Sequence, residues 1–117
     1  MPPGVGHLSA LRLKQRFEAG EPLALLDVRE DVERTLCAIP APLGATDLHI
    51  PMGQVPARLD EIRRAVATAP LVVYCHLGQR SLWVARWLAA QGVAGIHNLS
   101  GGIDAWSEQV DPTMPRY

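Results

Sequence analysis

The chain contains 117 residues, of which 48% are apolar and 20% are charged, and its formal net charge is −1. This length and composition fit one globular domain, 1–117, with its own hydrophobic core. The near-zero charge argues against electrostatic binding of nucleic acid, and no apolar run is long enough to span a membrane.

Apolar periodicity and breaking residues predict the first elements of the fold. Ser9 is a candidate N-cap for a helix over 10–18, with a glycine at its end. The apolar run over 23–28 predicts a buried strand. A charged turn and a short helix over 31–36 are expected to follow.

The next segment, 37–52, contains three prolines and a glycine and predicts a loop with a short strand over 48–50. Apolar residues then recur at i, i+4, i+7 and i+11, while charged residues occupy the intervening positions. This pattern predicts an amphipathic helix over 55–67.

The remaining sequence alternates between short apolar runs and helical patterns. The run over 71–74 contains no polar residue, which is typical of strands that are covered on both faces in a parallel sheet. Further along we expect a helix over 81–91, a strand over 95–99, a helix over 101–110 and an irregular tail over 111–117. This order predicts an α/β fold, a small three-layer domain whose mostly parallel central sheet is flanked by helices.

The segment LVVYCHLGQRS places Cys75 where a buried strand passes into a helix. Ligands of open parallel sheets bind beyond the carboxyl ends of the strands. The amides that start the following helix, the turn at Gly78 and the charge of Arg80 all favour a thiolate. We therefore expect Cys75 to be a nucleophile.

Other reactive groups are weaker candidates. Cys37 borders a proline-rich loop without a polar cluster, which favours a structural or incidental thiol. His76 is either a general base or a solvent-facing loop residue. No Cys and His spacing indicates a metal site, and no C-x-x-C motif is present. The lack of a signal peptide pattern predicts a reducing, cytoplasmic setting.

Three segments in this order resemble the rhodanese-like sulfurtransferase family: LLDVRE at 25–30, VVYCHLGQRS at 72–81 and NLSGGIDAW at 98–106. The resemblance covers about 8–110 and implies a single rhodanese-like domain. It also implies that the loop after Cys75 holds the substrate. The implied substrate-binding residues are His76, Leu77, Gly78, Gln79, Arg80 and Ser81.

The resemblance assigns supporting roles to other residues. Asp27 and Arg29 match the family's Asp-x-Arg and are implied to brace the site, although by themselves they are equally a strand-end salt bridge or solvated charges. The SGGIDAW stretch implies a close glycine turn and a core position for Trp106. The segment over 37–49 departs from the family, which often has Gly-His where this chain has Cys37 and Ala38.

The spacing of the arginine separates two reactions. Four residues lie between Cys75 and Arg80, whereas the tyrosine-phosphatase signature has five. The resemblance thus implies transfer of a sulfane sulfur, from a donor such as thiosulfate to cyanide, a small thiol or a protein thiol, through a Cys75 persulfide and without a cofactor. The alternatives are a non-catalytic binding or redox-sensing module and a phosphatase or arsenate reductase. The sequence predicts neither the physiological donor and acceptor nor the oligomeric state.

Overall fold

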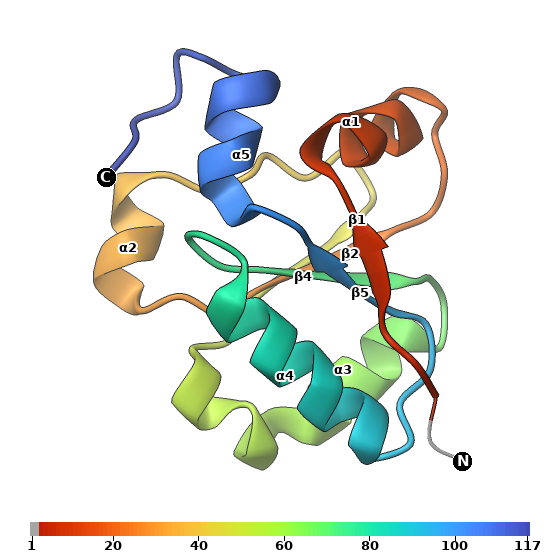
Figure 1. Cartoon of the computed structure of the whole chain (residues 1–117). Coiled ribbons are helices and arrows are strands. Elements are labelled where there is room, and N and C mark those ends of the chain that lie inside the picture. Colours follow the sequence, from red (N-terminus) through yellow and green to blue (C-terminus); the bar gives the residue numbers. More distant parts are fainter. Residues whose placement is uncertain (1–2) are drawn as a thin grey trace.

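Five parallel strands form the central sheet of the structure, a computed structural model that describes residues 3–117 (Figure 1). They are β1 (Gly6–Leu8), β2 (Ala24–Asp27), β3 (Thr46–His49), β4 (Leu71–Tyr74) and β5 (Ile96–Leu99). Their order across the sheet is β1–β5–β4–β2–β3, and every neighbouring pair is parallel. The predicted α/β class with a parallel sheet is confirmed.

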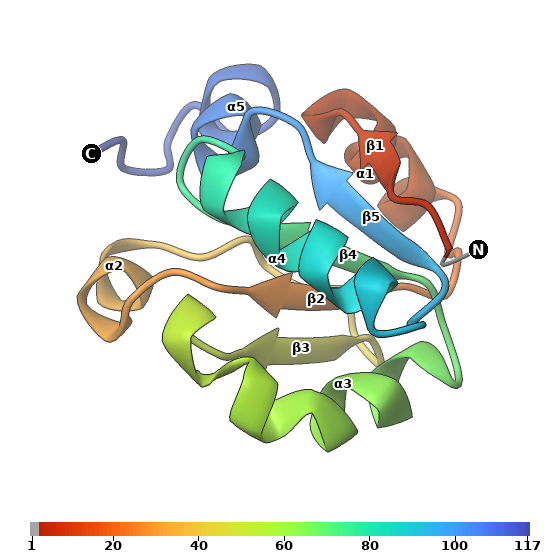
Figure 2. The same ribbon diagram turned by 60° about the horizontal axis from the view of Figure 1, so that its bottom comes forward.

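Helices cover both faces of this sheet. They are α1 (Ala10–Glu18), α2 (Asp31–Leu36), α3 (Leu59–Val66), α4 (Gln79–Ala90) and α5 (Gly102–Gln109). Helices α1 and α5 pack on one face, and α3 and α4 on the other (Figures 1 and 2). Helix α2 lies beyond the sheet, on the side where β2 ends (Figure 1). The three predicted layers are therefore present, with α2 placed close to the ends of the central strands.

The two central strands, β2 and β4, are buried at every position, which explains their uninterrupted apolar sequences. Alternate side chains of these strands enter two separate hydrophobic clusters. Leu26 and Val73 pack in the cluster that contains Leu88 of α4, whereas Leu25 and Val72 pack in the cluster on the opposite face. The period of two along each strand thus supplies both sides of the core from one short apolar run.

Apart from shifts of one residue, four elements differ from the predicted ranges. Strand β1 was not predicted, because three residues are too few to show alternation. The predicted strand over 48–50 is instead β3, an edge strand with a half-exposed and polar sequence. The predicted helix over 55–67 starts with 3₁₀ turns at Met52–Gln54 and Pro56–Arg58, because the proline lacks an amide hydrogen. Helix α4 begins at Gln79 rather than at 81.

The parallel arrangement brings the turns after β2 and β4 together. Asp27, the last residue of β2, pairs in register with Tyr74, the last residue of β4. Cys75 follows Tyr74 directly, so the charged turn after β2 adjoins the cysteine loop. No helix within residues 3–117 has the length and apolar content needed to cross a bilayer.

Candidate functional site

The Cys75 side chain lies at the N-terminus of α4 and is 1% exposed. Its Sγ atom accepts hydrogen bonds from the amides of Gly78 at 3.1 Å and Ser81 at 3.4 Å. Because α4 starts at Gln79, the Ser81 amide belongs to the first helical turn, whose amides have no partner within the helix. Two oriented backbone donors and the positive end of the helix dipole therefore face this sulfur.

A buried side-chain network continues from the sulfur to β5. Ser81 Oγ lies 3.3 Å from Cys75 Sγ and 2.6 Å from Asn98 Oδ1. Asn98 also donates through Nδ2 to the carbonyl oxygen of Gly78 at 3.3 Å. Ser81 has one hydroxyl hydrogen, so it can donate to only one of these two partners at a time. Its oxygen lies between the Cys75 sulfur and the side-chain amide of Asn98. Asn98 therefore contacts both the N-cap of α4 at Gly78 and its first turn at Ser81.

Glycines let helix α5 approach the cysteine loop closely. Gly78 has a φ of 102°, a conformation that favours glycine, and it forms the N-cap of α4. A Cβ at Gly102 would collide with the carbonyl oxygens of Cys75 and His76. This close approach lets the amides of Ile103 and Asp104 donate to those two carbonyls at 2.9 and 3.1 Å. The carbonyls are thus turned toward α5. Trp106 is 5% exposed in the core, which confirms the structural role expected for this stretch.

The Arg80 side chain pairs with a carboxylate that sequence reasoning did not single out. Its Nη1 and Nη2 atoms donate to Glu33 Oε1 and Oε2 at 2.6 and 2.8 Å. The hydrogen bond from Arg80 is the main reason that the pKa of Glu33 falls from an ordinary 4.5 to about 2. Arg80 therefore brings no uncompensated charge to the sulfur, and the expected contribution of a full positive charge is reduced.

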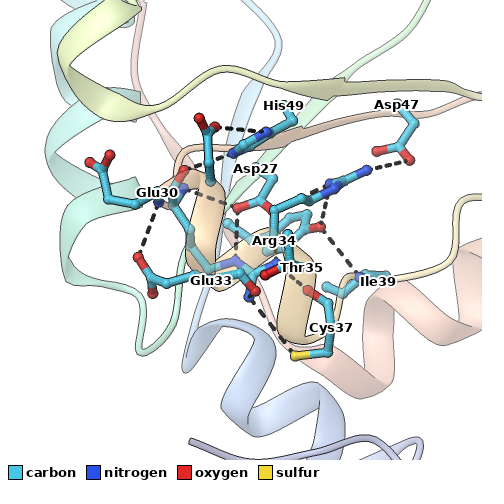
Figure 3. Close-up of polar contacts among 12 residues, drawn as sticks. Asp27, Glu30, Glu33, Arg34, Thr35, Cys37, Ile39, Asp47 and His49 are labelled. Atoms are coloured by element: carbon cyan, nitrogen blue, oxygen red, sulfur yellow. Dashed lines mark hydrogen bonds and ion pairs between the residues drawn. The ribbon is translucent and has the colours of Figure 1, made fainter.

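Asp27 and Arg29 form a buried ion pair rather than solvated charges, and both are 0% exposed. Arg29 Nε and Nη2 donate to the two Asp27 oxygens at 2.9 and 2.8 Å. Arg29 also donates to the carbonyl oxygens of Glu33 and Cys37, at 3.3 and 2.7 Å. Arg29 thereby holds α2 in its middle, at Glu33, and at its C-cap, Cys37. Figure 3 shows Asp27, Glu33 and Cys37 around this helix. The ion pair's geometric connection to the cysteine loop runs through Glu33.

The tail over 111–117 contains no helix or strand, as predicted, but it contacts the site through Tyr117. The Tyr117 ring stacks on His76 with centroids 3.9 Å apart. Its hydroxyl donates to Glu33 Oε2 at 2.8 Å and accepts from Arg29 Nη1 at 3.0 Å. Burial is the main reason that the pKa of Tyr117 rises to about 12, so the hydroxyl keeps its hydrogen at neutral pH. Tyr117 therefore connects three parts of the site.

A small cavity of about 100 Å³ opens at the sulfur. Its lining residues are Cys75, His76, Leu77, Gln79 and Arg80. Leu77 is 56% exposed at its rim. A larger hollow of about 350 Å³, lined by residues near Pro22 and Leu43, does not include the cysteine. Within residues 3–117, no group of three or more His, Cys, Asp or Glu side chains is arranged to hold a metal ion.

A family model described as "Rhodanese-like domain" matches residues 9–109. The chain belongs to the rhodanese-like domain family. This rhodanese-like chain is 33% identical over 110 residues to a protein named "Sulfurtransferase" from Allochromatium vinosum, covering 94% of this chain and 95% of that one. The alignment therefore spans nearly the whole length of both chains.

Two solved structures have the same fold. A rhodanese-like domain protein from Staphylococcus aureus superposes with a TM-score of 0.74 at 25% identity, covering 97% of this chain and 99% of that one. The human single-domain sulfurtransferase TSTD1 gives a TM-score of 0.67 at 25% identity, with coverages of 91% and 98%. The expected rhodanese-like fold is thereby confirmed.

Sequence reasoning about this rhodanese-like chain missed three residues of the site: Glu33, Asn98 and Tyr117. Glu33 follows Glu30 by three positions at the start of a short helix, a spacing that indicated a role at the helix terminus. Its contact with Arg80 spans 47 positions and had no local signal. Asn98 opens the NLSGGIDAW segment, which marks its family position but not its contact with Ser81, and Tyr117 in the irregular tail carried no signal.

Proposed function

We propose that this chain is a sulfurtransferase that carries a sulfane sulfur on Cys75 as a persulfide. The donor is a small molecule such as thiosulfate, and the acceptor is cyanide, a small thiol or a protein thiol. The observation that carries the proposal is the contact of Cys75 Sγ with the amides of Gly78 and Ser81 at the start of α4. Sequence similarity to a named sulfurtransferase supports it.

In the first step, the Cys75 thiol loses its proton to solvent and the thiolate attacks the outer sulfur of thiosulfate. The sulfur–sulfur bond of the donor breaks, and its electron pair leaves with sulfite. A new bond joins Sγ to the transferred sulfur, which carries the negative charge. Amides aimed at the sulfur stabilise anionic charge without having to reorganise.

In the second step, the acceptor attacks the outer sulfur of the persulfide. The bond to Sγ breaks, and its electron pair returns to Cys75 as the thiolate. These two half-reactions form a ping-pong cycle with one covalent intermediate. They need no cofactor, since sulfur enters and leaves at the same oxidation level.

We assign the substrate contacts to the loop and first helical turn that follow the nucleophile. The proposed residues are His76, Leu77, Gly78, Gln79, Arg80 and Ser81. Asp27 and Arg29 brace this region through α2, because their ion pair fixes the segment from which Glu33 reaches Arg80. We further propose one domain with its core over 8–110 and a reducing compartment such as the cytoplasm, where both free cysteines stay reduced.

Intact-mass measurement after thiosulfate treatment tests the proposal. We expect a gain of about 32 Da, one sulfur atom, that cyanide removes with formation of thiocyanate. Cys75→Ser should abolish this gain, whereas Cys37→Ser should retain it. If the wild-type chain gains no cyanide-removable sulfur from thiosulfate or from an organic persulfide, the proposed reaction is wrong. The alternative of a docking or oxidant-sensing module would then stand.

The cavity also bears on the phosphatase alternative. The Cys75–Arg80 spacing of four residues, against five in the tyrosine-phosphatase signature, disfavours a phosphatase, and the one arginine that lines the cavity is already paired with Glu33. Hydrolysis of an aryl phosphate that disappears in Cys75→Ser would contradict this assignment.

A further inference from the structure

Glu33 neutralises the one arginine that lines the sulfur cavity. Both Arg80 terminal nitrogens are engaged by both Glu33 oxygens, at 2.6 and 2.8 Å. This is the bidentate geometry in which an arginine–carboxylate pair is strongest. The Glu33 side chain is 15% exposed, so solvent screens the pair less than it screens a surface ion pair.

Tyr117 fixes the carboxylate in this position. Its hydroxyl donates to Glu33 Oε2 at 2.8 Å, and its ring rests on His76 of the cysteine loop. Glu33 Oε1 also accepts from the Glu30 amide at 3.1 Å. With three donors in place, the carboxylate stays ionised and cannot turn away from Arg80 without losing several hydrogen bonds.

The other arginines near the site are paired as well. Arg29 is held by Asp27, and Arg34 by Asp27 and Asp47, while Arg116 is held by Asp104. The other lining side chains, Leu77 and Gln79 among them, carry no permanent charge. A donor that enters this cavity therefore meets oriented amides but no uncompensated arginine among the described residues.

We infer that Glu33, held in place by Tyr117, is a specificity-determining residue that weakens the binding of anionic sulfur donors by keeping Arg80 paired. The inference rests on the proposed sulfur transfer and assigns the donor preference of the same site. Donors of lower charge are favoured relative to dianions such as thiosulfate. The opposite hypothesis is that Glu33 orients Arg80 to bind the anionic donor. Replacing Glu33 by Gln would then raise KM for thiosulfate instead of lowering it.

The inference is tested by measuring KM for two sulfur donors of different charge. Thiosulfate is a dianion, and methanethiosulfonate is a monoanion that donates its outer sulfur in the same way and releases methanesulfinate. Because a Coulomb energy scales with the product of the charges, Glu33→Gln should affect the dianion more. We expect KM to fall about fivefold for thiosulfate and about twofold for methanethiosulfonate, where a fivefold change equals about 1 kcal/mol.

Glu61→Gln is the matched control. Glu61 forms a bidentate pair with Arg58, at 2.8 and 3.0 Å, on the surface of the α3 region and outside the cavity. The Glu61→Gln variant changes the net charge of the chain by the same amount as Glu33→Gln. We expect KM for both donors to stay within about 1.5-fold of the wild-type value, because exposed charges are screened beyond about 10 Å. An equal effect of both variants would show a general charge effect and overturn the inference.

The double variant Glu33→Gln/Arg80→Gln tests whether Arg80 carries the effect. It removes both charges, so KM for thiosulfate should no longer lie below the wild-type value. A rise in KM in Glu33→Gln, or a fall that persists in the double variant, contradicts the inference.

Wild-type kinetics at different salt concentrations provide a readout that needs no variant. If Arg80 is neutralised, kcat/KM for thiosulfate should fall less than about twofold between about 20 and 200 mM salt, whereas a free cation would give a steeper fall. A steep fall overturns the inference but leaves the proposed function intact. Absence of persulfide with every donor defeats the proposed function instead, so the two failures are distinguishable.

Discussion

Cys75 and Cys37 follow neighbouring strands but lie at opposite ends of their helices. Cys75 precedes α4, a helix of twelve residues, and two amides donate to its sulfur. Cys37 is the C-cap of α2, a helix of six residues. The N-terminus of a helix favours an anion and the C-terminus disfavours one. The two cysteines therefore lie at helix ends of opposite dipole sign, Cys75 at the corner after β4 and Cys37 at the corner after β2.

The supporting interactions of the two corners differ in the same way. At the corner after β4, the groups that contact or support the sulfur are uncharged, namely amides, Ser81 and Asn98. The corner after β2 is built on the Asp27–Arg29 ion pair, and the Cys37 sulfur lies 3.9 Å from Arg29 Nη1 and 3.6 Å from the Pro115 carbonyl oxygen. This comparison teaches that the first corner surrounds a buried sulfur with oriented donors, while the second is built around a buried ion pair.

Breaking the ion pair should have the largest effect on stability. Asp27→Asn leaves Arg29 buried without its anion, and we expect unfolding in urea to show a loss of about 3–5 kcal/mol. Asp47→Asn is the control, because Asp47 pairs with Arg34 where both side chains are about 30% exposed, and it should cost under about 1 kcal/mol. Equal losses in the two variants would contradict the structural role of the second corner.

Changing the uncharged corner should affect rate more than stability. Ser81→Ala removes the hydroxyl between Cys75 Sγ and Asn98, and we expect persulfide formation from thiosulfate to slow about tenfold, a barrier increase of about 1.4 kcal/mol. Ser107→Ala is a matched control, since that buried hydroxyl donates to the Met114 carbonyl. It should lose similar stability and keep its rate. An unchanged rate in Ser81→Ala would exclude a role for this hydroxyl.

The Glu33 carboxylate links the two corners and gives them a common dependence on pH. Its pKa is lowered to about 2 in the fold, first by Arg80, so its stabilising contribution is complete above the ordinary value of 4.5. That contribution is lost as the pH falls from 4.5 through about 2. The stability advantage of the wild type over Glu33→Gln should therefore shrink between about pH 5 and 2. Urea midpoints that keep a constant difference across this range would argue against the pairing.

Cys37→Ser should have the smallest effect. The Cys37 sulfur is half-buried, and its neighbours Arg29 and Pro115 offer only long contacts at 3.9 and 3.6 Å. We expect sulfur transfer to change less than about twofold and unfolding free energy to change less than about 1 kcal/mol. A loss of transfer comparable to that in Cys75→Ser would erase the contrast between the two corners.

Much of the fold was predictable from local patterns. Helix α1 and strand β4 have their predicted bounds, because a clear N-cap at Ser9 and an uninterrupted apolar run are local signals. Strand β1 and the start of α3 were not predicted correctly. The first is a three-residue edge strand that exists through its pairing with β5, and the second is altered by Pro56.

The surroundings of Cys75 were also predictable. A cysteine between a buried strand and a glycine-bearing loop indicates a reactive corner, and the structure places amides at that sulfur. The neutralisation of Arg80 was not predictable, since Glu33 lies 47 positions away and Tyr117 lies in an irregular tail. Nothing in the local sequence around either residue marks them as partners.

By itself, the sequence determined the α/β alternation, the buried central strands and the corner at which Cys75 stands, because each depends on periodicity and on neighbours within a few residues. Only the tertiary structure decided which charges meet. Parallel pairing of β2 with β4 brings the turn after Asp27 beside the cysteine loop, and the tail then adds Tyr117. An ion pair between distant segments depends on the spatial order of strands, so the electrostatics of this site are a property of the folded sheet.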